Sequence, residues 1–319
     1  MYLTQQQKNK ILAYSDMGFS SRYIAKEVLG SKSRKSTVND FLARGEFHTP
    51  DFVGEKDKPR ILCFDLETSV PITANFGRHK VFLGQDNIIR EGGKLLCVGY
   101  RWLGEPSSSI ISMTPEEAIA DDDSRVVGEL WELFELADAV VAHNGNSFDV
   151  PMLKARVIAN GFPPLPTVKT LDTLTMAKRF RFPNNKLDSL AAYFGFERKV
   201  DAGGVQTWIK FSEGDKDAMK HMVDYCLHDT DLLHDIYLKL RTFGNASDFN
   251  AAFYSSKDGI KCNICGGNYV ANTGRNVYTA VSVFNEMRCG DCGAVSRTRT
   301  PINTKEQRKD VVFTPKTTG

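Results

Sequence analysis

Hydrophobic and polar positions divide the chain into three stretches with different patterns. Up to residue 47, short apolar groups recur at helical spacing between turn residues. Residues 60–245 hold apolar runs that later alternate with amphipathic stretches, which predicts an α/β domain. Residues 257–300 contain two Cys-x-x-Cys pairs. Residues 48–59 and 301–319 are polar without periodicity, so we expect a linker and a flexible tail.

The first stretch predicts three short helices. An apolar group at 11–14 ends the first, Ser20 caps the second, and the third spans 35–42 with polar and basic side chains facing outward. This arrangement resembles the helix-turn-helix modules of site-specific recombinases and bacterial regulators. A small helical domain that binds a protein partner, or that only packs on the core, would show the same pattern.

The middle stretch predicts a mixed sheet covered by helices. Its strands come first in succession and then alternate with helices, as in domains whose sheet has both parallel and antiparallel strands. The expected strands are 60–68, 94–102, 109–113, 139–143 and 168–171, and the expected helices are 115–137, 148–160, 187–194 and 216–240.

Asp65 and Glu67 form the first candidate functional pair. They stand two apart in a strand, so both point to the same face of the sheet. Apolar residues on both faces of this strand indicate a central strand and argue against an exposed edge. Two like charges there repel and lose hydration, an arrangement that divalent cations between them would make tolerable.

Further acidic positions follow. Asp149 comes after the strand 139–143 and an Asn/Gly turn, beyond the carboxyl end of a strand, where α/β sheets place their sites. Tyr225 and Asp229 stand four apart in the last long helix and share a face, whereas His228 points about 100° away from Asp229. Alone, such an Asp is more often a helix cap, and such a Tyr/Asp pair is usually structural.

In this order, the three motifs resemble those of DEDD-type 3′–5′ exonucleases of the ribonuclease-H-like superfamily, over residues 60–240. The matches are Asp-x-Glu at Asp65, Asn and three residues before aromatic-Asp at Asn144, and Tyr-x-x-x-Asp at Tyr225. The stretch is similar in particular to the proofreading domains of family B DNA polymerases and their stand-alone relatives. The resemblance implies an α/β fold with a mixed five-stranded sheet and flanking helices.

The resemblance also implies the tyrosine subclass. The histidine branch has its base five residues before the last Asp, where this chain has Asp224, whereas the tyrosine branch needs the Tyr found at 225. Tyr225 would then be the general base or would orient the attacking water. Because the free phenol has a pKa near 10, orienting the water is the better match at neutral pH.

The implied mechanism is phosphodiester hydrolysis with two Mg²⁺ or Mn²⁺ ions about 3.5–4 Å apart. Asp65 would bridge the ions, Glu67 and Asp229 would bind the ion that activates water, and Asp149 would support the other ion through coordinated water. The products would be 5′-mononucleotides. Three residues are expected to contact the substrate: Thr68, Asn144 and Phe148.

Four cysteines form two knuckles separated by 23 residues, and they are Cys262, Cys265, Cys289 and Cys292. Glycines in the knuckles let both sulfurs of each pair turn toward one point, and four thiolates suit one structural Zn²⁺ ion. The runs 269–271 and 278–283 have β character, which predicts a zinc ribbon. A redox dithiol or a pair of disulfides are the alternatives. The other three cysteines, in apolar runs, are expected to be buried thiols: Cys63, Cys97 and Cys226.

The net charge of +2 conceals an uneven distribution. Residues 1–58 carry 10 basic and 7 acidic side chains, 59–253 carry 21 and 27, and 254–319 carry 10 and 5. The basic ends favour nucleic acid as the partner, and we expect DNA in preference to RNA. The basic residues around the cysteines are Arg275, Arg288, Arg297, Arg299, Lys305, Arg308 and Lys309.

The chain has no run of the about 18–20 apolar residues that a membrane span needs, and no secretory apolar segment at its start. We therefore expect it in the cytoplasm, that of the host if a phage encodes it. The expected function is 3′–5′ hydrolysis of DNA single strands or 3′ ends in replication, proofreading in trans or repair, where a separate polymerase or replication protein would be a partner. The alternatives are a 3′–5′ exoribonuclease and a non-catalytic DNA-binding regulator on the same scaffold.

Overall fold

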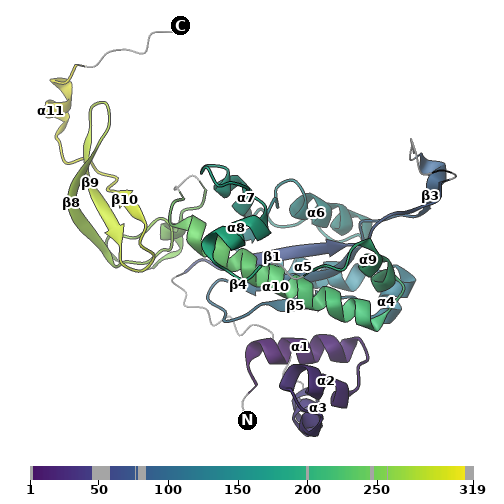
Figure 1. Ribbon diagram of the computed structural model, residues 1–319. Coiled ribbons are helices and arrows are strands. Elements are labelled where there is room, and N and C mark those ends of the chain that lie inside the picture. The colour runs from purple at the N-terminus through teal and green to yellow at the C-terminus, as the bar shows by residue number, and fades with distance from the viewer. Residues whose placement is uncertain are drawn as a thin grey trace. The chain divides into compact units, whose positions relative to one another are not determined.

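The computed structural model describes residues 3–44, 58–75, 77, 84–198, 201–244, 248–256 and 258–312 (Figure 1). Two compact units make up the chain, one from residues 1–51 and 60–237 and the other from 52–59 and 238–319. Most of the expected linker, residues 48–57, and the end of the expected tail, residues 313–319, lie outside the described residues. None of the described helices is both long enough and apolar enough to cross a lipid bilayer.

A mixed five-stranded sheet forms the centre of the first unit. Its strands lie in the order β5-β4-β1-β6-β7, with β4 antiparallel and β6 parallel to the central β1. The expected mixed sheet with flanking helices is therefore confirmed. The strands are β1 (Ile61–Thr68), β4 (Leu95–Trp102), β5 (Ser109–Ser112), β6 (Ala139–Ala142) and β7 (Lys169–Asp172).

The central strand β1 is buried on both faces. Phe64 is fully buried and packs edge-on against Phe134 of α5, with ring centroids 5.2 Å apart. On the other face, Cys226 of the long helix α10 contacts the backbone of β1 and β4. Helices thus cover both faces of the sheet (Figure 1). They include α5 (Ser124–Leu136), α6 (Asp149–Ala159), α8 (Leu187–Phe194) and α10 (Lys216–Arg241).

The helical stretch expected over 115–137 consists of two helices, α4 (Pro115–Ala120) and α5. Asp121 ends α4 in the left-handed conformation with a φ of 55°. Asp123 is fully buried, where its carboxylate accepts hydrogen bonds from the Leu95 N–H at 3.0 Å and from Arg156 at 2.7 Å. The helix is interrupted here because the Asp123 carboxylate bonds the start of α5 to β4 and α6. Periodicity along the helix does not reveal such a contact.

Several described elements of the first unit, besides its 3₁₀ turns, have no counterpart in the sequence-based expectation. The two strands and the shorter helix span two to five residues, and elements this short carry little periodicity. The longer helix has eight residues, as many as the predicted helix 187–194, and its apolar spacing is a signal that sequence reasoning missed. These elements are the strands β2 (Ile72–Thr73) and β3 (Ile88–Arg90) and the helices α7 (Thr173–Ala177) and α9 (Val205–Ser212).

The amino-terminal helices belong to the first unit. Ser20 caps the second helix as expected, by accepting from the Tyr23 N–H. The first helix packs against the sheet domain, since the Asn9 amide donates to the Ser108 carbonyl at 2.8 Å, and the Tyr14 hydroxyl donates to Asp224 of α10 at 2.8 Å. The three helices are α1 (Gln5–Asp16), α2 (Ser21–Leu29) and α3 (Lys35–Arg44), with a 3₁₀ turn at Lys32–Arg34 before α3.

The second unit contains a three-stranded antiparallel sheet in the order β10-β9-β8. The β run expected at 278–283 is wrong, because Thr279 and Ser282 close a hairpin turn in which the Thr279 N–H donates to the Ser282 carbonyl at 2.9 Å. A short helix also lies inside the expected tail. The elements are a 3₁₀ turn at Ala251–Tyr254, β8 (Val270–Tyr278), β9 (Val283–Cys289), β10 (Val295–Arg297) and α11 (Lys305–Lys309).

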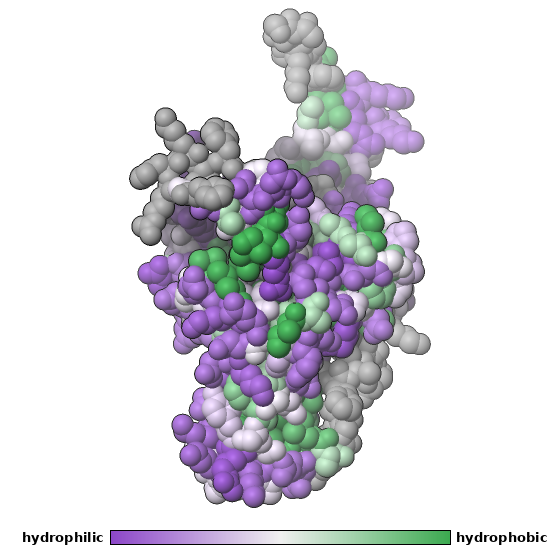
Figure 2. Space-filling model, turned by 90° about the vertical axis from the view of Figure 1, so that its right-hand side faces the viewer, coloured by the Kyte–Doolittle hydropathy of each residue, from purple (hydrophilic) through white to green (hydrophobic). Residues whose placement is uncertain are grey.

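The surface is mostly hydrophilic on the face shown in Figure 2, with separate hydrophobic patches. Exposed apolar side chains among the described residues include Ile89, Ile119 and Val205. Single apolar side chains are common on protein surfaces, so these three give no indication of a partner by themselves.

Candidate active site

Asp65 and Glu67 lie on the face of β1 that α10 covers. Both side chains are half-buried, and Leu66 between them is buried on the opposite face. Asp65 is paired with Gly99 of the antiparallel neighbour β4, and a bulge follows at Glu67 and Thr68. The expected central position of this acidic strand is therefore confirmed.

Gly99 lets α10 come close to these two carboxylates. A side chain at this position would place its Cβ 2.1 Å from the Thr230 hydroxyl and 2.8 Å from the Cys226 carbonyl, so only glycine fits. The gap that glycine leaves is closed by Cys226, whose sulfur accepts from the Gly99 N–H at 3.0 Å and donates to the Asp65 carbonyl at 3.7 Å. The helical turn of α10 with Tyr225 and Asp229 is consequently held at the level of Asp65.

Tyr225 and Asp229 lie together on α10, as their four-residue spacing predicts. Asp229 is buried, and the two side chains are joined by a hydrogen bond. Burial, followed by the charges of Asp229, Glu67 and Asp65, raises the pKa of Tyr225 well above its usual value. The influence of three carboxylates on one phenol places Tyr225 beside both β1 and Asp229, and the phenol is neutral at physiological pH.

Asp149, at the start of α6, contacts the end of β1 that carries Asp65 and Glu67. Because β6 pairs with β1 only at Ile61–Cys63, the Leu66 N–H lies beyond that pairing, and the Asp149 carboxylate accepts its hydrogen bond. Asp149 is buried in the first turn of α6. Burial raises its pKa to about 7, and the nearby charge of Asp172 acts in the same direction.

Asp172 organises the turn that carries Asp149. Its carboxylate accepts from the Asn144 N–H at 3.0 Å, from the Asn146 N–H at 3.4 Å, and from the Leu174 N–H at 2.9 Å, so it caps α7 and holds the β6–α6 turn at once. Asn144 in that turn has a φ of 71°, a conformation in which Asn is among the better-tolerated residues. Sequence reasoning gave Asp172 no role, and an Asp directly before a short helix was the available signal.

Two of the three expected substrate contacts are chain neighbours of proposed site residues, Thr68 of Glu67 and Phe148 of Asp149. Thr68 is half-buried at the end of β1, and Phe148 is 41% exposed just before Asp149. Asn144, with His143, lines an open cavity of about 680 Å³ whose other wall is formed by residues 183–188 and Leu174. Their roles in binding a substrate remain predictions.

Residues 95–241 match a protein family described as the RNase_H superfamily. The fold is ribonuclease-H-like. The matched residues begin after β1, so Asp65 and Glu67 lie outside them. The chain is also similar to a solved structure, the family B DNA polymerase from the hyperthermophilic archaeon Pyrobaculum calidifontis, with 18% sequence identity and a TM-score of 0.43. That match covers 58% of this chain and 25% of the polymerase, so the chain spans about a quarter of the polymerase's length. No curated protein matches the chain.

Among the described residues, the four knuckle cysteines form a group of metal-ligating side chains whose ligand atoms all lie within 4.8 Å of one another.

The four knuckle cysteines of the second unit converge on one point. Sulfur atoms from different knuckles lie 3.7 Å apart in two pairs, Cys262 with Cys292 and Cys265 with Cys289, and all four are free thiols. A tetrahedron with Zn–S bonds of about 2.3 Å has edges of about 3.8 Å. The spacing fits one tetrahedral ion and is too long for the expected alternative of disulfides.

Backbone N–H groups support the sulfurs. The Ile264 N–H points to the Cys262 sulfur and the Gly267 N–H to the Cys265 sulfur, each at 3.4 Å. The hydrogen bond from Cys265 lowers the pKa of Cys262 to about 5, whereas burial first of all raises that of Cys292 to about 11. One sulfur ionises readily and the negative charge opposes the next ionisation, a repulsion that a divalent cation would relieve. The three other cysteines, Cys63, Cys97 and Cys226, are buried thiols that form no disulfide, as predicted.

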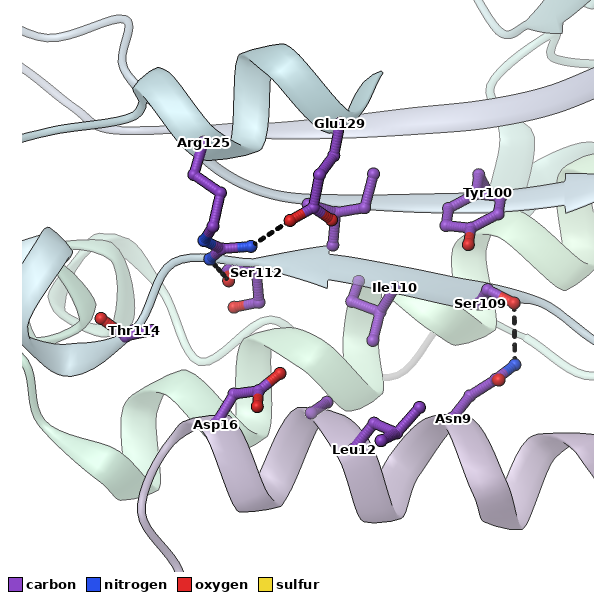
Figure 3. Close-up of a pocket in the computed structure, with 12 residues that line it drawn as sticks. Asn9, Leu12, Asp16, Tyr100, Ser109, Ile110, Ser112, Thr114, Arg125 and Glu129 are labelled. Carbon is purple, nitrogen blue, oxygen red and sulfur yellow. Dashed lines mark hydrogen bonds and ion pairs between the residues drawn. The ribbon is translucent and has the colours of Figure 1, made fainter. Parts of the chain in front are cut away.

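A second cavity lies where α1 packs against β5 (Figure 3), and its lining does not include Asp65 or Glu67. Its volume is about 430 Å³, and Asp16 and Leu12 of α1 face Arg125 and β5 across it. Arg125 is held by Glu117 at 2.8 Å, by Glu129 at 2.7 Å and by the Ser112 carbonyl at 2.7 Å. The Arg125 guanidinium is thus hydrogen-bonded by protein groups. The cavity is an imperfectly filled contact between α1 and the sheet.

Proposed function

We propose that the ribonuclease-H-like domain is a divalent-metal-dependent 3′–5′ exonuclease of the DEDD tyrosine subclass that acts on DNA. The observation that carries the proposal is the meeting of Asp65, Glu67, Asp149, Tyr225 and Asp229 at one end of β1, although they come from three separate elements. Carboxylate oxygens are the ligands that Mg²⁺ and Mn²⁺ prefer. The buried carboxylates and the raised pKa of Asp149 and Tyr225 describe a site that would gain stability from cations.

The residues fit a two-ion site. Asp65, Glu67 and Asp229 would hold the ion that activates water, Asp65 would also help to hold the second ion, and Asp149 would support that second ion. When bound, such ions lower the pKa of the attacking water and stabilise the leaving oxygen. The hydrogen bond from the Leu66 N–H holds the Asp149 carboxylate, and Asp172 fixes the turn behind it.

Tyr225 acts as a neutral hydrogen-bonding group in this proposal. Burial and the charges of the nearby carboxylates raise the pKa of Tyr225 in the metal-free site, so the phenol is neutral there and suits a role in orienting the attacking water. This agrees with the water-orienting role that the sequence favours. Asn144 and Phe148 would hold the terminal nucleotide.

The two ends of the chain would hold the nucleic acid strand. Exposed basic and polar side chains lie around the start of α3, among them Lys32, Arg34 and Lys35, and they are suited to duplex DNA in a helix-turn-helix arrangement. In the second unit, a structural Zn²⁺ bound by the four cysteines would make β8–β10 a zinc ribbon, with Arg275 and Arg299 exposed for phosphate contacts. The role served would be replication, trans proofreading or repair.

The test compares single-stranded DNA, duplex DNA and RNA of one sequence, each labelled at the 5′ end, with Mg²⁺ or Mn²⁺. We expect stepwise shortening of DNA from the 3′ end, and loss of that activity in Asp65→Ala and Asp149→Ala. Glu135→Ala is the matched control, because Glu135 is an exposed carboxylate on α5, across the sheet from α10. Digestion of RNA alone would assign an exoribonuclease. Tight duplex binding with no release of nucleotides would assign a DNA-binding regulator.

A further inference from the structure

Trp208 touches two of the five proposed active-site residues, although it belongs to none of the three motifs. Its indole N–H donates to Glu67 Oε2 at 3.2 Å. Its ring also packs edge-on against Tyr225, with centroids 6.5 Å apart and planes at 69°. One side chain on α9 therefore contacts both β1 and α10 at the site.

The fold fixes the position of α9 at both ends. Before the helix, His221 of α10 bonds the Asp201 carbonyl at 2.8 Å. After Trp208, the buried Phe211 anchors the helix, and Arg90 donates to the Ser212 carbonyl at 3.3 Å. The indole is thus carried on a helix tied to α10 and β3, and its direction is set by the packing.

A neutral donor at this place has a specific chemical value. A carboxylate has about four lone-pair positions, so one N–H bond to Glu67 fixes its plane and leaves capacity for a cation. An indole carries no charge, and it does not compete with a cation for Glu67 as Lys or Arg would. Its edge contact with the phenol ring of Tyr225 limits the orientations open to that side chain.

We propose that Trp208 is a positioning residue that orients Glu67 for its divalent ion and Tyr225 for the attacking water. This inference rests on the proposed exonuclease function. Partners that hold metal ligands in place typically change metal affinity or activity by about 10- to 100-fold when removed. A residue that only fills space would leave the affinity for Mg²⁺ unchanged when its ring is replaced by another ring.

The first measurement uses the unaltered, zinc-loaded protein. The chain has three tryptophans, each with one indole N–H signal in a ¹⁵N–¹H spectrum. Adding Mg²⁺ should shift the signal of Trp208 and leave those of Trp102 and Trp131 nearly unchanged. Because this measurement needs no variant for its readout, it stands even if a substitution disturbs folding.

The second measurement compares Trp208→Phe with Trp131→Phe, which also replaces an indole that donates a hydrogen bond, at 3.0 Å to the Pro163 carbonyl. By calorimetry, Trp208→Phe should bind Mg²⁺ about 10-fold or more weakly, and Trp131→Phe as tightly as the unaltered protein. Mg²⁺ binding with an unmoved Trp208 signal, or equal affinity in the two variants, would overturn the role of Trp208 alone. Absence of both Mg²⁺ binding and nuclease activity in the unaltered protein would overturn the proposed function with it.

Discussion

The two candidate metal sites of this chain are assembled in opposite ways. In the second unit, each knuckle supplies two sulfurs three residues apart, and all four sulfurs lie within 4.8 Å. In the ribonuclease-H-like domain, the ligands are separated by up to 164 residues, from Asp65 to Asp229, and they come from β1, α6 and α10. The first kind of site is local in sequence and the second is a product of the whole fold.

This difference matches the difference between structural and catalytic sites. Four thiolates saturate a tetrahedral ion and leave no position for a substrate. The carboxylate site is accompanied by groups that would not bind metal, such as Tyr225 and Trp208, and it is bordered by an open cavity at Asn144. We therefore expect loss of the first site to affect folding and loss of the second to affect chemistry.

The largest expected effect is that of Asp229→Asn on nuclease activity. The substitution keeps the size of this buried side chain but removes a charge that would hold the metal. We expect the rate of nucleotide release to fall more than about 100-fold, since even indirect partners of a metal cost 10- to 100-fold. His228→Ala is the control, because His228 lies on another face of α10, where its side chain bonds the Arg198 carbonyl. Equal rates in the two variants would mean that Asp229 has no part in the reaction.

Cys262→Ser should remove zinc and unfold the second unit only. We expect about one equivalent of zinc in the unaltered protein and little in the variant, with loss of protection from proteolysis confined to residues after about 250. Asp258→Asn changes an exposed residue of the same unit and should keep the zinc. If Cys262→Ser lost the nuclease activity on short single strands to the same extent as Asp229→Asn, the contrast between the two sites would be wrong.

Gly99→Val tests how the fold brings the carboxylates together. The added side chain would collide with Thr230 and the Cys226 backbone and push α10 from the sheet. We expect a loss of about 1–3 kcal/mol in unfolding free energy and a lower rate of hydrolysis, measured by denaturant unfolding and by nucleotide release. Gly84→Ala, where a Cβ meets only an ordinary contact at 3.6 Å, should change neither quantity noticeably. A Gly99→Val protein with normal activity would show that the close approach of α10 is unnecessary.

The smallest expected effect is the pH dependence of the stability of the metal-free protein. The pKa of Asp149 is raised in the folded state, to about 7 from 3.8, so its contribution to stability is complete below about pH 4 and is lost as the pH rises through about 7. Asp149→Asn should therefore gain stability relative to the unaltered protein between about pH 4 and pH 7, as measured by thermal unfolding. Because Mg²⁺ needs the ionised carboxylate, its affinity should rise over the same range in the unaltered protein. Parallel stability curves for the two proteins would contradict a raised pKa.

The sequence predicts this molecule best where the determining interactions are local. The strand with Asp65 and Glu67, the Tyr225–Asp229 pair and the cysteine knuckles follow from spacing alone. The break at Asp121–Asp123 does not, because its cause is a buried bond from Asp123 to Leu95, 28 residues away. The contact of Trp208 with Glu67 spans 141 residues, so spacing along the chain does not reveal it.

Gly99 illustrates the same limit. In the sequence, a glycine within a strand predicts a weakened strand. The packing of α10 against Gly99 shows why a residue without a side chain is needed there. Asp172 likewise reads as an ordinary cap of a short helix, whereas its carboxylate also holds the turn at Asn144. Residues that act by permitting or bracing a contact between distant elements leave little trace in the local pattern.

The contact between α1 and α10 limits which amino-terminal helices could be fused to this domain. Asp224 sits beside Tyr225 in the chain, and its carboxylate is held by Lys10 at 2.6 Å and Tyr14 at 2.8 Å from α1, as well as by Lys220 at 3.2 Å from α10 itself. A gene fusion that exchanged the first helix for an unrelated one would leave Lys220 alone to balance a largely buried charge next to the proposed water-orienting tyrosine. The amino-terminal helices are therefore not a module that can be exchanged freely. We expect them to be inherited together with the sheet domain against which α1 packs.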